Sequence, residues 1–128
     1  MTPEHFMNKA ARAAASARLL LDAGDVEGAC HRAYYAMFNA AHAALLCPAP
    51  GPLRKARGPT AVSLLHKHLV RTGSLPAGLG KALNQVERAR LLADYTGEEI
   101  GMEKARWAVE QAEGFVATVD RKFAAPWE

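Results

Sequence analysis

Residues Ala33–Leu46, AYYAMFNAAHAALL, carry the clearest structural signal of this 128-residue chain. Apolar residues recur in it at helical spacing, and the pattern extends back to Val26, just after Asp25, a residue suited to capping a helix. The apolar positions form two adjacent faces, one with Val26, Cys30, Ala33, Met37, Ala40 and Ala44, the other with Tyr34, Phe38, Ala41 and Leu45. A helix that is apolar around most of its circumference belongs in the middle of a bundle, and its alanines allow neighbouring backbones to approach closely. The sequence therefore predicts a central helix that runs from Asp25 to about Leu46.

Helical signals also dominate the sequence on both sides of this central helix. Thr2-Pro3-Glu4 supplies a capping threonine, a proline for the first helical position and an early acid, so a helix is expected from there to Gly24. After the central helix, Cys47–Pro59 contains four prolines and is expected to form a long irregular loop.

Three more helices are expected after this loop. The first begins after a capping Thr60 and ends near Thr72-Gly73, and the second opens at Ser74-Leu75-Pro76. The third begins at Thr96-Gly97-Glu98-Glu99, where an acid three residues after a threonine forms a capping box, and it ends before Pro126. Since no window alternates like a strand, the predicted fold is an all-α, antiparallel up-and-down bundle of about five helices.

The length and composition suit one domain over residues 1–128, because half of the residues are hydrophobic and can bury a core. The two cysteines, Cys30 and Cys47, lie far apart and match no metal or redox spacing, which favours a reducing, cytoplasmic setting. No signal peptide or membrane segment is expected, because the longest uncharged stretch, Ala33–Pro52, has too few strongly apolar residues to span a bilayer.

Positive charge is concentrated in the middle of the sequence. The formal net charge is only +3, but eight basic residues and a single acid, Glu87, lie between Gly51 and Ala93, which gives this segment +7 and leaves −4 for the rest. Three of the basic residues, Arg54, Lys55 and Arg57, fall in the expected loop. Such an asymmetry is typical of a surface that meets a phosphate-rich partner, and it is also compatible with an ordinary solvated surface.

A charged residue interrupts the apolar stripe of the helix that opens at Ser74-Leu75-Pro76. Arg90 stands in line with Leu79, Leu83, Val86 and Ala93. A guanidinium at such a place must pair, line a cleft or face another subunit, because an unpaired buried charge is costly. Asp94, four residues on, can pair with it, while Arg88 and Tyr95 share a neighbouring face. Two interpretations stay open: an Arg90–Asp94 ion pair with Tyr95 packed beneath it, or a functional site that includes Arg88 and Tyr95.

Polar residues also interrupt the apolar surface of the central helix. His31, Tyr35 and His42 fall close to one line along that helix, and Arg32 and Asn39 share another. These residues either form the wall of a pocket, with stacking rings and titratable imidazoles, or they satisfy one another across the bundle. For zinc, His42 and Cys47 are too few ligands, so no metal or cofactor is expected.

Several of these runs together resemble a known family. Ala33–Phe38 followed by Ala40–Leu46 resembles the second helix of small stand-alone prokaryotic HEPN proteins. The likeness continues through His66, Val70-Arg71-Thr72-Gly73-Ser74-Leu75-Pro76, Arg88, Arg90, Ala93-Asp94-Tyr95 and Phe115-Val116. The resemblance covers most of the chain and implies an antiparallel helical bundle that commonly forms a homodimer. It also implies pairing with a minimal nucleotidyltransferase in a toxin–antitoxin module.

Many HEPN proteins are metal-independent ribonucleases that use an arginine followed, after four to six residues, by a histidine, with the motifs of two chains meeting in a dimer. The arginine neutralises the scissile phosphate while the histidine moves protons. No arginine of this chain has a histidine at that distance, and Asp94 stands in the histidine's place after Arg88. A carboxylate near two arginines stays ionised at neutral pH and repels a phosphate. The departure predicts a member that does not cleave RNA by this route.

The sequence as a whole predicts a HEPN-type module, part of a toxin–antitoxin-like pair, that binds a nucleotidyltransferase partner, RNA or nucleotide phosphates through a basic cleft. The candidate reacting residues are Arg88, Arg90 and Asp94, and the candidate binding residues are Tyr95, Tyr35, Arg32, Asn39, Arg54, Lys55 and Arg57. Two alternatives stay open. One is an active metal-independent ribonuclease in which Arg88 or Arg90 works with His31 or His42. The other is a purely structural helical scaffold.

Overall fold

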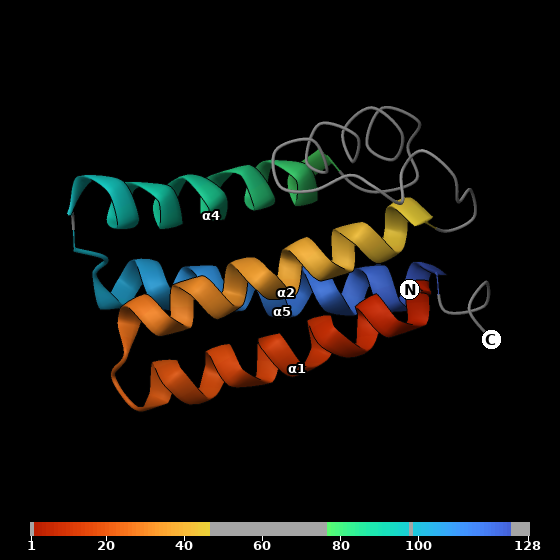
Figure 1. Cartoon of the computed structure of the whole chain (residues 1–128), viewed down its shortest axis with the longest axis horizontal. Coiled ribbons are helices and arrows are strands. Elements are labelled where there is room, and N and C mark those ends of the chain that lie inside the picture. Colours follow the sequence, from red (N-terminus) through yellow and green to blue (C-terminus); the bar gives the residue numbers. More distant parts are fainter. Residues whose placement is uncertain (1, 47–76, 98, 124–128) are drawn as a thin grey trace.

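Four antiparallel helices make up the part of the chain that the structure describes (Figure 1). The structure is a computed structural model, and it describes residues 2–46, 77–97 and 99–123. The helices are α1 (Pro3–Asp22), α2 (Val26–Leu46), α4 (Ala77–Thr96) and α5 (Met102–Phe123). They run alternately up and down and no strand occurs in the three described ranges, so the predicted all-α class is confirmed. The predicted loop over 47–59 and the helix expected after Thr60 lie outside these ranges.

The starts of α1 and α2 follow the predicted capping residues. Thr2 Oγ1 accepts a hydrogen bond from the His5 backbone N–H at 3.1 Å, ahead of a proline in the first turn. Asp25 Oδ1 accepts one from the Gly28 backbone N–H at 2.9 Å. Between the two helices, Gly24 has a φ of 86°, a left-handed conformation that glycine adopts without steric cost. The short connection places α1 and α2 side by side along their length (Figure 1).

The capping box predicted at Thr96 is wrong as a helix start. Thr96 is the last residue of α4, and its hydroxyl donates a hydrogen bond to the Leu92 carbonyl of the same helix. Gly97 then adopts a φ of 73°, the left-handed conformation with which helices commonly end. The last helix, α5, begins only at Met102.

Burial of an apolar residue marks the true start of α5. The first backbone bond of this helix runs from the Ala105 N–H to the Gly101 carbonyl at 3.0 Å. Ile100, just before that turn, and Ala105, within it, are both buried. This placement is typical of a hydrophobic staple, which fixes the angle at which the chain enters a helix.

The central position predicted for the helix over 26–46 is confirmed, because α2 contacts α1, α4 and α5. Six of its alanines are completely buried: Ala29, Ala33, Ala36, Ala40, Ala43 and Ala44. The small side chains let the neighbouring helices approach closely, and the larger core residues Met37, Leu83 and Phe115 come from three helices. None of the described helices is long and apolar enough to cross a lipid bilayer.

Candidate functional site

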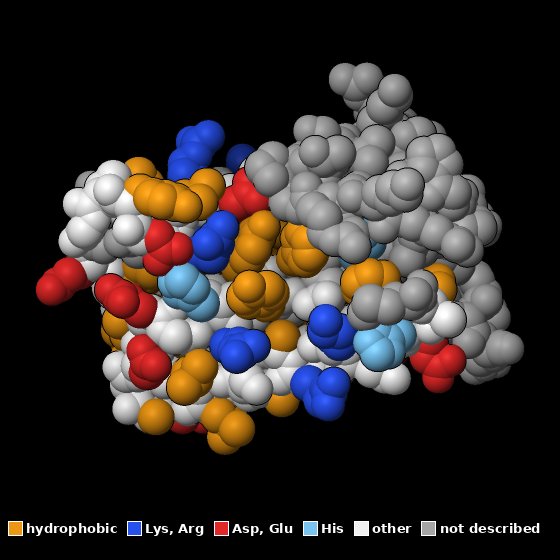
Figure 2. All heavy atoms as spheres, viewed as in Figure 1, with side chains coloured by type: hydrophobic (Ala, Val, Ile, Leu, Met, Phe, Trp, Pro, Cys, Tyr) orange, Lys and Arg blue, Asp and Glu red, His pale blue; other side chains and the backbone are white. Residues whose placement is uncertain are grey.

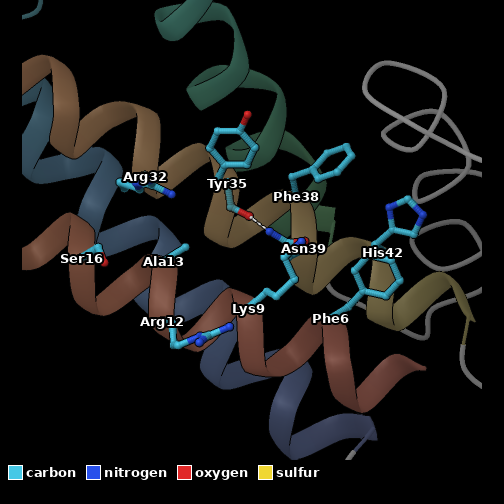
Figure 3. A pocket seen from close by; sticks show the side chains of 10 residues that line it. All are labelled: Phe6, Lys9, Arg12, Ala13, Ser16, Arg32, Tyr35, Phe38, Asn39 and His42. Carbon is cyan, nitrogen blue, oxygen red and sulfur yellow. Dashed lines mark hydrogen bonds between the residues drawn. The ribbon is translucent and has the colours of Figure 1, made fainter. Parts of the chain in front are cut away.

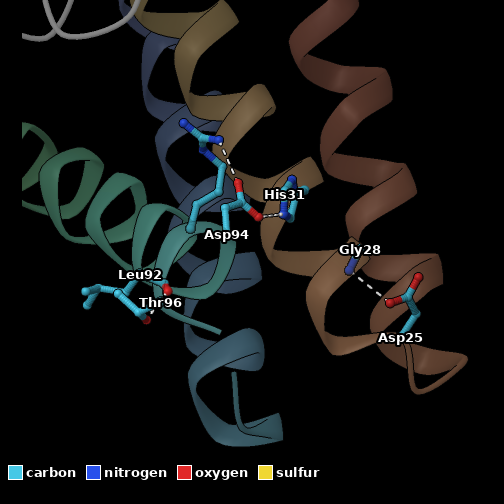
Figure 4. A network of polar contacts seen from close by, with 7 residues as sticks. Asp25, Gly28, His31, Leu92, Asp94 and Thr96 are labelled. Atoms are coloured by element: carbon cyan, nitrogen blue, oxygen red, sulfur yellow. Dashed lines mark hydrogen bonds and ion pairs between the residues drawn. The ribbon is translucent and has the colours of Figure 1, made fainter. Parts of the chain in front are cut away.

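A cluster of polar side chains joins α2 to α4 around Asp94. One oxygen of this carboxylate, Oδ2, accepts a hydrogen bond from Arg90 Nη1 at 3.2 Å, and the other, Oδ1, lies 3.0 Å from His31 Nε2 (Figure 4). The Tyr34 hydroxyl donates to Glu87 Oε2 at 3.0 Å beside them. We call His31, Tyr34, Glu87, Arg90 and Asp94 the α2–α4 cluster.

Tyr34 is the buried member of the α2–α4 cluster. The Arg90 guanidinium lies over its ring, 4.6 Å from the centroid. Burial, and then the hydrogen bond to Glu87, raise the pKa of Tyr34 to about 12. The phenol therefore stays protonated at neutral pH and keeps its role as a hydrogen-bond donor.

The predicted Arg90–Asp94 ion pair is present, but the aromatic ring beside it is not the expected one. Tyr95 is 81% exposed and does not pack beneath the pair, whereas Tyr34 does. The reason is geometric, because consecutive residues of a helix point about 100° apart. When Asp94 faces α2, Tyr95 must point away from it.

The chemistry of this cluster is that of an arginine and a histidine already bound to an anion. The Asp94 carboxylate contacts both the Arg90 guanidinium and the His31 imidazole, the two kinds of group that a ribonuclease would apply to a phosphate. A phosphate that approaches Arg90 must therefore compete with an internal carboxylate. The cluster as observed fixes α4 on α2 and presents no unengaged arginine–histidine pair.

Arg88 and Tyr95 lie on another face of α4, as their spacing predicted. They border a surface groove of about 530 Å³, which we call the α4 groove. Its lining consists of Asn84, Glu87, Arg88, Leu91, Leu92, Tyr95 and Thr96. Leu92 and Tyr95 are among the most exposed large apolar side chains of the described residues. The α4 groove is thus partly apolar with one cation at its border.

A second pocket lies between α1 and α2, and none of its lining residues belongs to the α2–α4 cluster. It encloses about 470 Å³, and we call it the α1–α2 pocket (Figure 3). The residues that line it are Phe6, Lys9, Arg12, Ala13, Ser16, Arg32, Tyr35, Phe38, Asn39 and His42. The sequence places Tyr35 and His42 on one line of the central helix and Arg32 and Asn39 on another, and all four line this pocket from α2. Residues of α1 form the opposite wall.

Ring contacts and one hydrogen bond hold the walls of the α1–α2 pocket. Phe6 of α1 stacks on His42 of α2, with centroids 4.6 Å apart and planes within 11°, and Phe38 meets the same imidazole edge-on at 5.4 Å. Asn39 Nδ2 donates to the Tyr35 carbonyl at 2.9 Å (Figure 3). The Tyr35 ring itself is half exposed, so one aromatic surface faces the solvent side of the pocket.

The charge of this lining is entirely positive. Lys9 and Arg12 come from α1 and Arg32 from α2, and none of the lining residues is acidic. Figure 2 shows Lys and Arg side chains gathered on the face where α1 and α2 meet. Lys9 and Arg12 were not among the residues predicted from the sequence, although a signal exists: no acid stands between Glu4 and Asp22, while three basic residues do.

The structure separates the two histidines proposed as partners of the α4 arginines. His31 lies in the α2–α4 cluster, in contact with Asp94. The expectation that His42 lies beside these arginines is wrong, because that imidazole is fully buried between Phe6 and Phe38. The loop residues Arg54, Lys55 and Arg57 lie outside the described residues. Within the described ranges, no three His, Cys, Asp or Glu side chains are placed to hold a metal ion.

Comparison with known proteins gives two findings. A family model described as "HEPN domain" matches residues 3–122, which include all four described helices except the last residue of α5. The chain is also similar to the UPF0332 protein glr0978 of Gloeobacter violaceus, with 38% identity over 99 residues that cover 76% of each protein. The family match extends over both the α2–α4 cluster and the α1–α2 pocket and assigns a role to neither.

Proposed function

This chain belongs to the HEPN domain family, and from that premise we propose that it is a HEPN-type module that binds single-stranded RNA at the α1–α2 pocket without cleaving it. The observation that carries the proposal is the composition of the pocket: three cationic side chains, a half-exposed tyrosine ring and no carboxylate. Cations attract the phosphate backbone, and an exposed ring offers a surface on which an unpaired base can stack. This combination is typical of proteins that bind single strands.

The geometry of the α2–α4 cluster supports binding without cleavage. Cleavage by attack of the RNA 2′-hydroxyl requires a group that takes and gives protons and a cation that neutralises the phosphate. His31 and Arg90 have the right chemistry for these two roles, but Asp94 contacts both of them. A phosphate would have to displace the Asp94 carboxylate before it could bind His31 and Arg90.

Fluorescence anisotropy with a labelled single-stranded RNA tests the binding. We expect the affinity to fall as the salt concentration rises, because bound phosphates release counterions. Arg12→Glu places a negative charge in the α1–α2 pocket and should weaken binding about tenfold or more. Arg121→Glu is the matched control, because Arg121 is exposed on α5, outside the pocket, and the variant changes the net charge by the same amount.

Incubation of the purified protein with total RNA in the absence of metal tests the lack of cleavage. We expect intact RNA at every time point. Products that disappear in Arg90→Ala would contradict the proposal and support the alternative of a metal-independent ribonuclease built on Arg90 and His31. Absence of RNA binding at all salt concentrations would instead support a purely structural scaffold.

The α4 groove favours a second function, docking of a protein partner. Leu92 is 42% exposed and Tyr95 is 81% exposed, and both line this groove, so two large apolar side chains lie together on the surface. We propose that this groove contacts a minimal nucleotidyltransferase, in the toxin–antitoxin-like pair that the family resemblance implies. A nucleotidyltransferase encoded beside this protein would be the first candidate.

Co-purification with that nucleotidyltransferase tests the partner. We expect Leu92→Asp to abolish co-purification, because a charge in an apolar contact must be desolvated. Leu19→Asp, at a leucine of α1 that is equally apolar and 70% exposed, should leave the complex intact. Equal loss or equal retention in both variants would contradict docking at the α4 groove.

A further inference from the structure

The α1–α2 pocket has features that point to one particular part of an RNA. On the basis of the proposed function, we infer that this pocket binds a terminal phosphomonoester nucleotide: the phosphate lies among Lys9, Arg12 and Arg32, and its base stacks on Tyr35. The same chemistry is present at a phosphorylated end of a single-stranded RNA and in a free nucleoside monophosphate. A phosphodiester inside an RNA strand lacks it.

The positive charge of the pocket favours a phosphomonoester. Lys9 and Arg12 are three residues apart on α1 and therefore lie on one face, and Arg32 lines the same pocket from α2 (Figure 3). A phosphomonoester carries about −1.5 to −2 charges at neutral pH, because its second pKa is about 6. An internal phosphodiester carries a single charge. Three cations without a neighbouring carboxylate match the first of these better than the second.

The size of the pocket and its aromatic wall suit a single nucleotide. A cavity of about 470 Å³ lies within the range of roughly 300–1,000 Å³ that is usual for small-molecule sites. Tyr35 offers a half-exposed ring that is held at its edge by the buried Tyr34, 6.1 Å away. The Arg32 guanidinium lies 5.9 Å from the Tyr35 centroid, so a cation stands next to the stacking surface. One nucleotide can therefore place its base and its phosphate on adjacent groups.

The aromatic wall also favours a single strand over a duplex. Bases inside a double helix are stacked on each other and leave no face for a side chain, whereas a terminal nucleotide of a single strand can turn its base outward. Asn39 lies between Tyr35 and His42 in the pocket, anchored by its hydrogen bond to the Tyr35 carbonyl. It gives this surface a fixed polar edge beside the ring.

Anisotropy with a set of oligonucleotides of one sequence tests the inference. One has a 5′-phosphate and a 3′ label, one a 3′-phosphate and a 5′ label, and each has a counterpart with a hydroxyl in place of the phosphate. We expect one phosphorylated end to bind about tenfold more tightly than its hydroxyl counterpart, because extra charge-assisted hydrogen bonds form. Adenosine and cytidine monophosphates serve as competitors that represent the free nucleotide.

Substitutions test whether the preference for a phosphorylated end arises in the α1–α2 pocket. Arg12→Gln should remove the preference for the phosphorylated end, and Tyr35→Ala should weaken binding of both ends. Tyr35→Phe keeps the ring and should restore binding. Arg121→Gln, an exposed cation of α5 outside the pocket, should retain the full preference.

The outcomes separate this inference from the proposed function. Equal affinity for phosphorylated and hydroxyl ends would overturn the inference while RNA binding itself stands. Absence of all RNA binding would overturn the proposed function, and calorimetric binding of a nucleoside monophosphate that Arg12→Gln abolishes would still support the pocket as a phosphomonoester site. A preference that persists in Arg12→Gln would overturn the assignment to this pocket.

Discussion

The Asp94 carboxylate has two partners on two helices, and each of its oxygens is used once. Arg90, one turn before it on α4, donates to Oδ2, and His31 of α2 contacts Oδ1. The Arg90 side chain is only 23% exposed, so its charge is partly removed from water and depends on this partner. A single side chain thus balances a cation and also links two elements.

Asp94→Asn tests that balance. The amide cannot neutralise Arg90, and we expect a loss of about 1–2 kcal/mol of unfolding free energy, the range for a hydrogen bond to a charged group that is partly solvated. Urea denaturation measures the loss. Asp120→Asn, at an exposed carboxylate of α5, is the matched control and should change stability little. Equal stability of both variants would show that the carboxylate of Asp94 does not hold the cluster.

Tyr34→Phe tests the buried phenol and its pH dependence. Because the pKa of Tyr34 is raised to about 12 in the folded protein, from about 10 in an unfolded chain, the neutral phenol stabilises the fold below pH 10. That contribution is lost as the pH rises from about 10 through about 12. We expect Tyr34→Phe to lower stability at neutral pH by about 1 kcal/mol and to weaken the alkaline decline. Denaturation across this pH range checks both, and the exposed Tyr95→Phe should leave the decline as it is.

Among the described helices, α4 packs mainly against α2. Its apolar side chains Ala82, Leu83 and Val86 are buried, and in the described residues its contacts are mostly with α2 and few with α5. The α2–α4 cluster lies toward the end of α4 that follows these residues. The buried apolar side chains of α4 and, further along the helix, the α2–α4 cluster therefore both hold α4 against α2.

Leu83→Ala tests the contribution of the buried apolar side chains of α4. Leu83 is fully buried, and its truncation leaves a cavity, so we expect a loss of about 2–5 kcal/mol of unfolding free energy. Thermal and urea denaturation followed by circular dichroism measure it. The same truncation at the exposed Leu92 is the control and should cost well under 1 kcal/mol. A comparable loss in both would contradict the observed orientation of α4.

At the scale of the whole molecule, the arrangement of charge matters more than its sum. The net charge of +3 is modest, yet Lys9, Arg12 and Arg32 surround one pocket that has no acidic lining. Replacing all three with glutamine should make the salt dependence of RNA binding less steep, since each phosphate charge that the pocket neutralises on a single strand contributes about 0.7 to the slope.

A second triple variant separates the position of charge from its amount. Lys81, Arg106 and Arg121 are exposed and lie outside the pocket, so replacing them with glutamine lowers the net charge by the same three units. We expect the salt dependence of this variant to stay close to that of the unchanged protein. Binding isotherms at several salt concentrations provide the slopes, and equal slopes for the two triple variants would contradict a localised site.

Much of the fold could be predicted from local patterns. The capping residues Thr2 and Asp25 mark the starts of α1 and α2, and Gly24 marks the turn between them. Arg90 in an apolar stripe correctly indicated its partner Asp94, because an ion pair within one helix depends only on helical spacing. The start of α5 could not be predicted from Thr96, since burial of Ile100 decides it.

The sequence alone was enough to predict the four described helices apart from the start of α5, the central place of α2, the Arg90–Asp94 pair and the family to which the chain belongs. Packing of the helices brings His31 to Asp94, 63 positions away, and brings Lys9 and Arg12 of α1 together with Arg32 around one pocket, and no local pattern predicts either arrangement. The physical reason is that helical periodicity assigns a side chain to a face of its own helix. Which helix that face meets, and at what rotation, depends on how the apolar faces of all the helices are buried together.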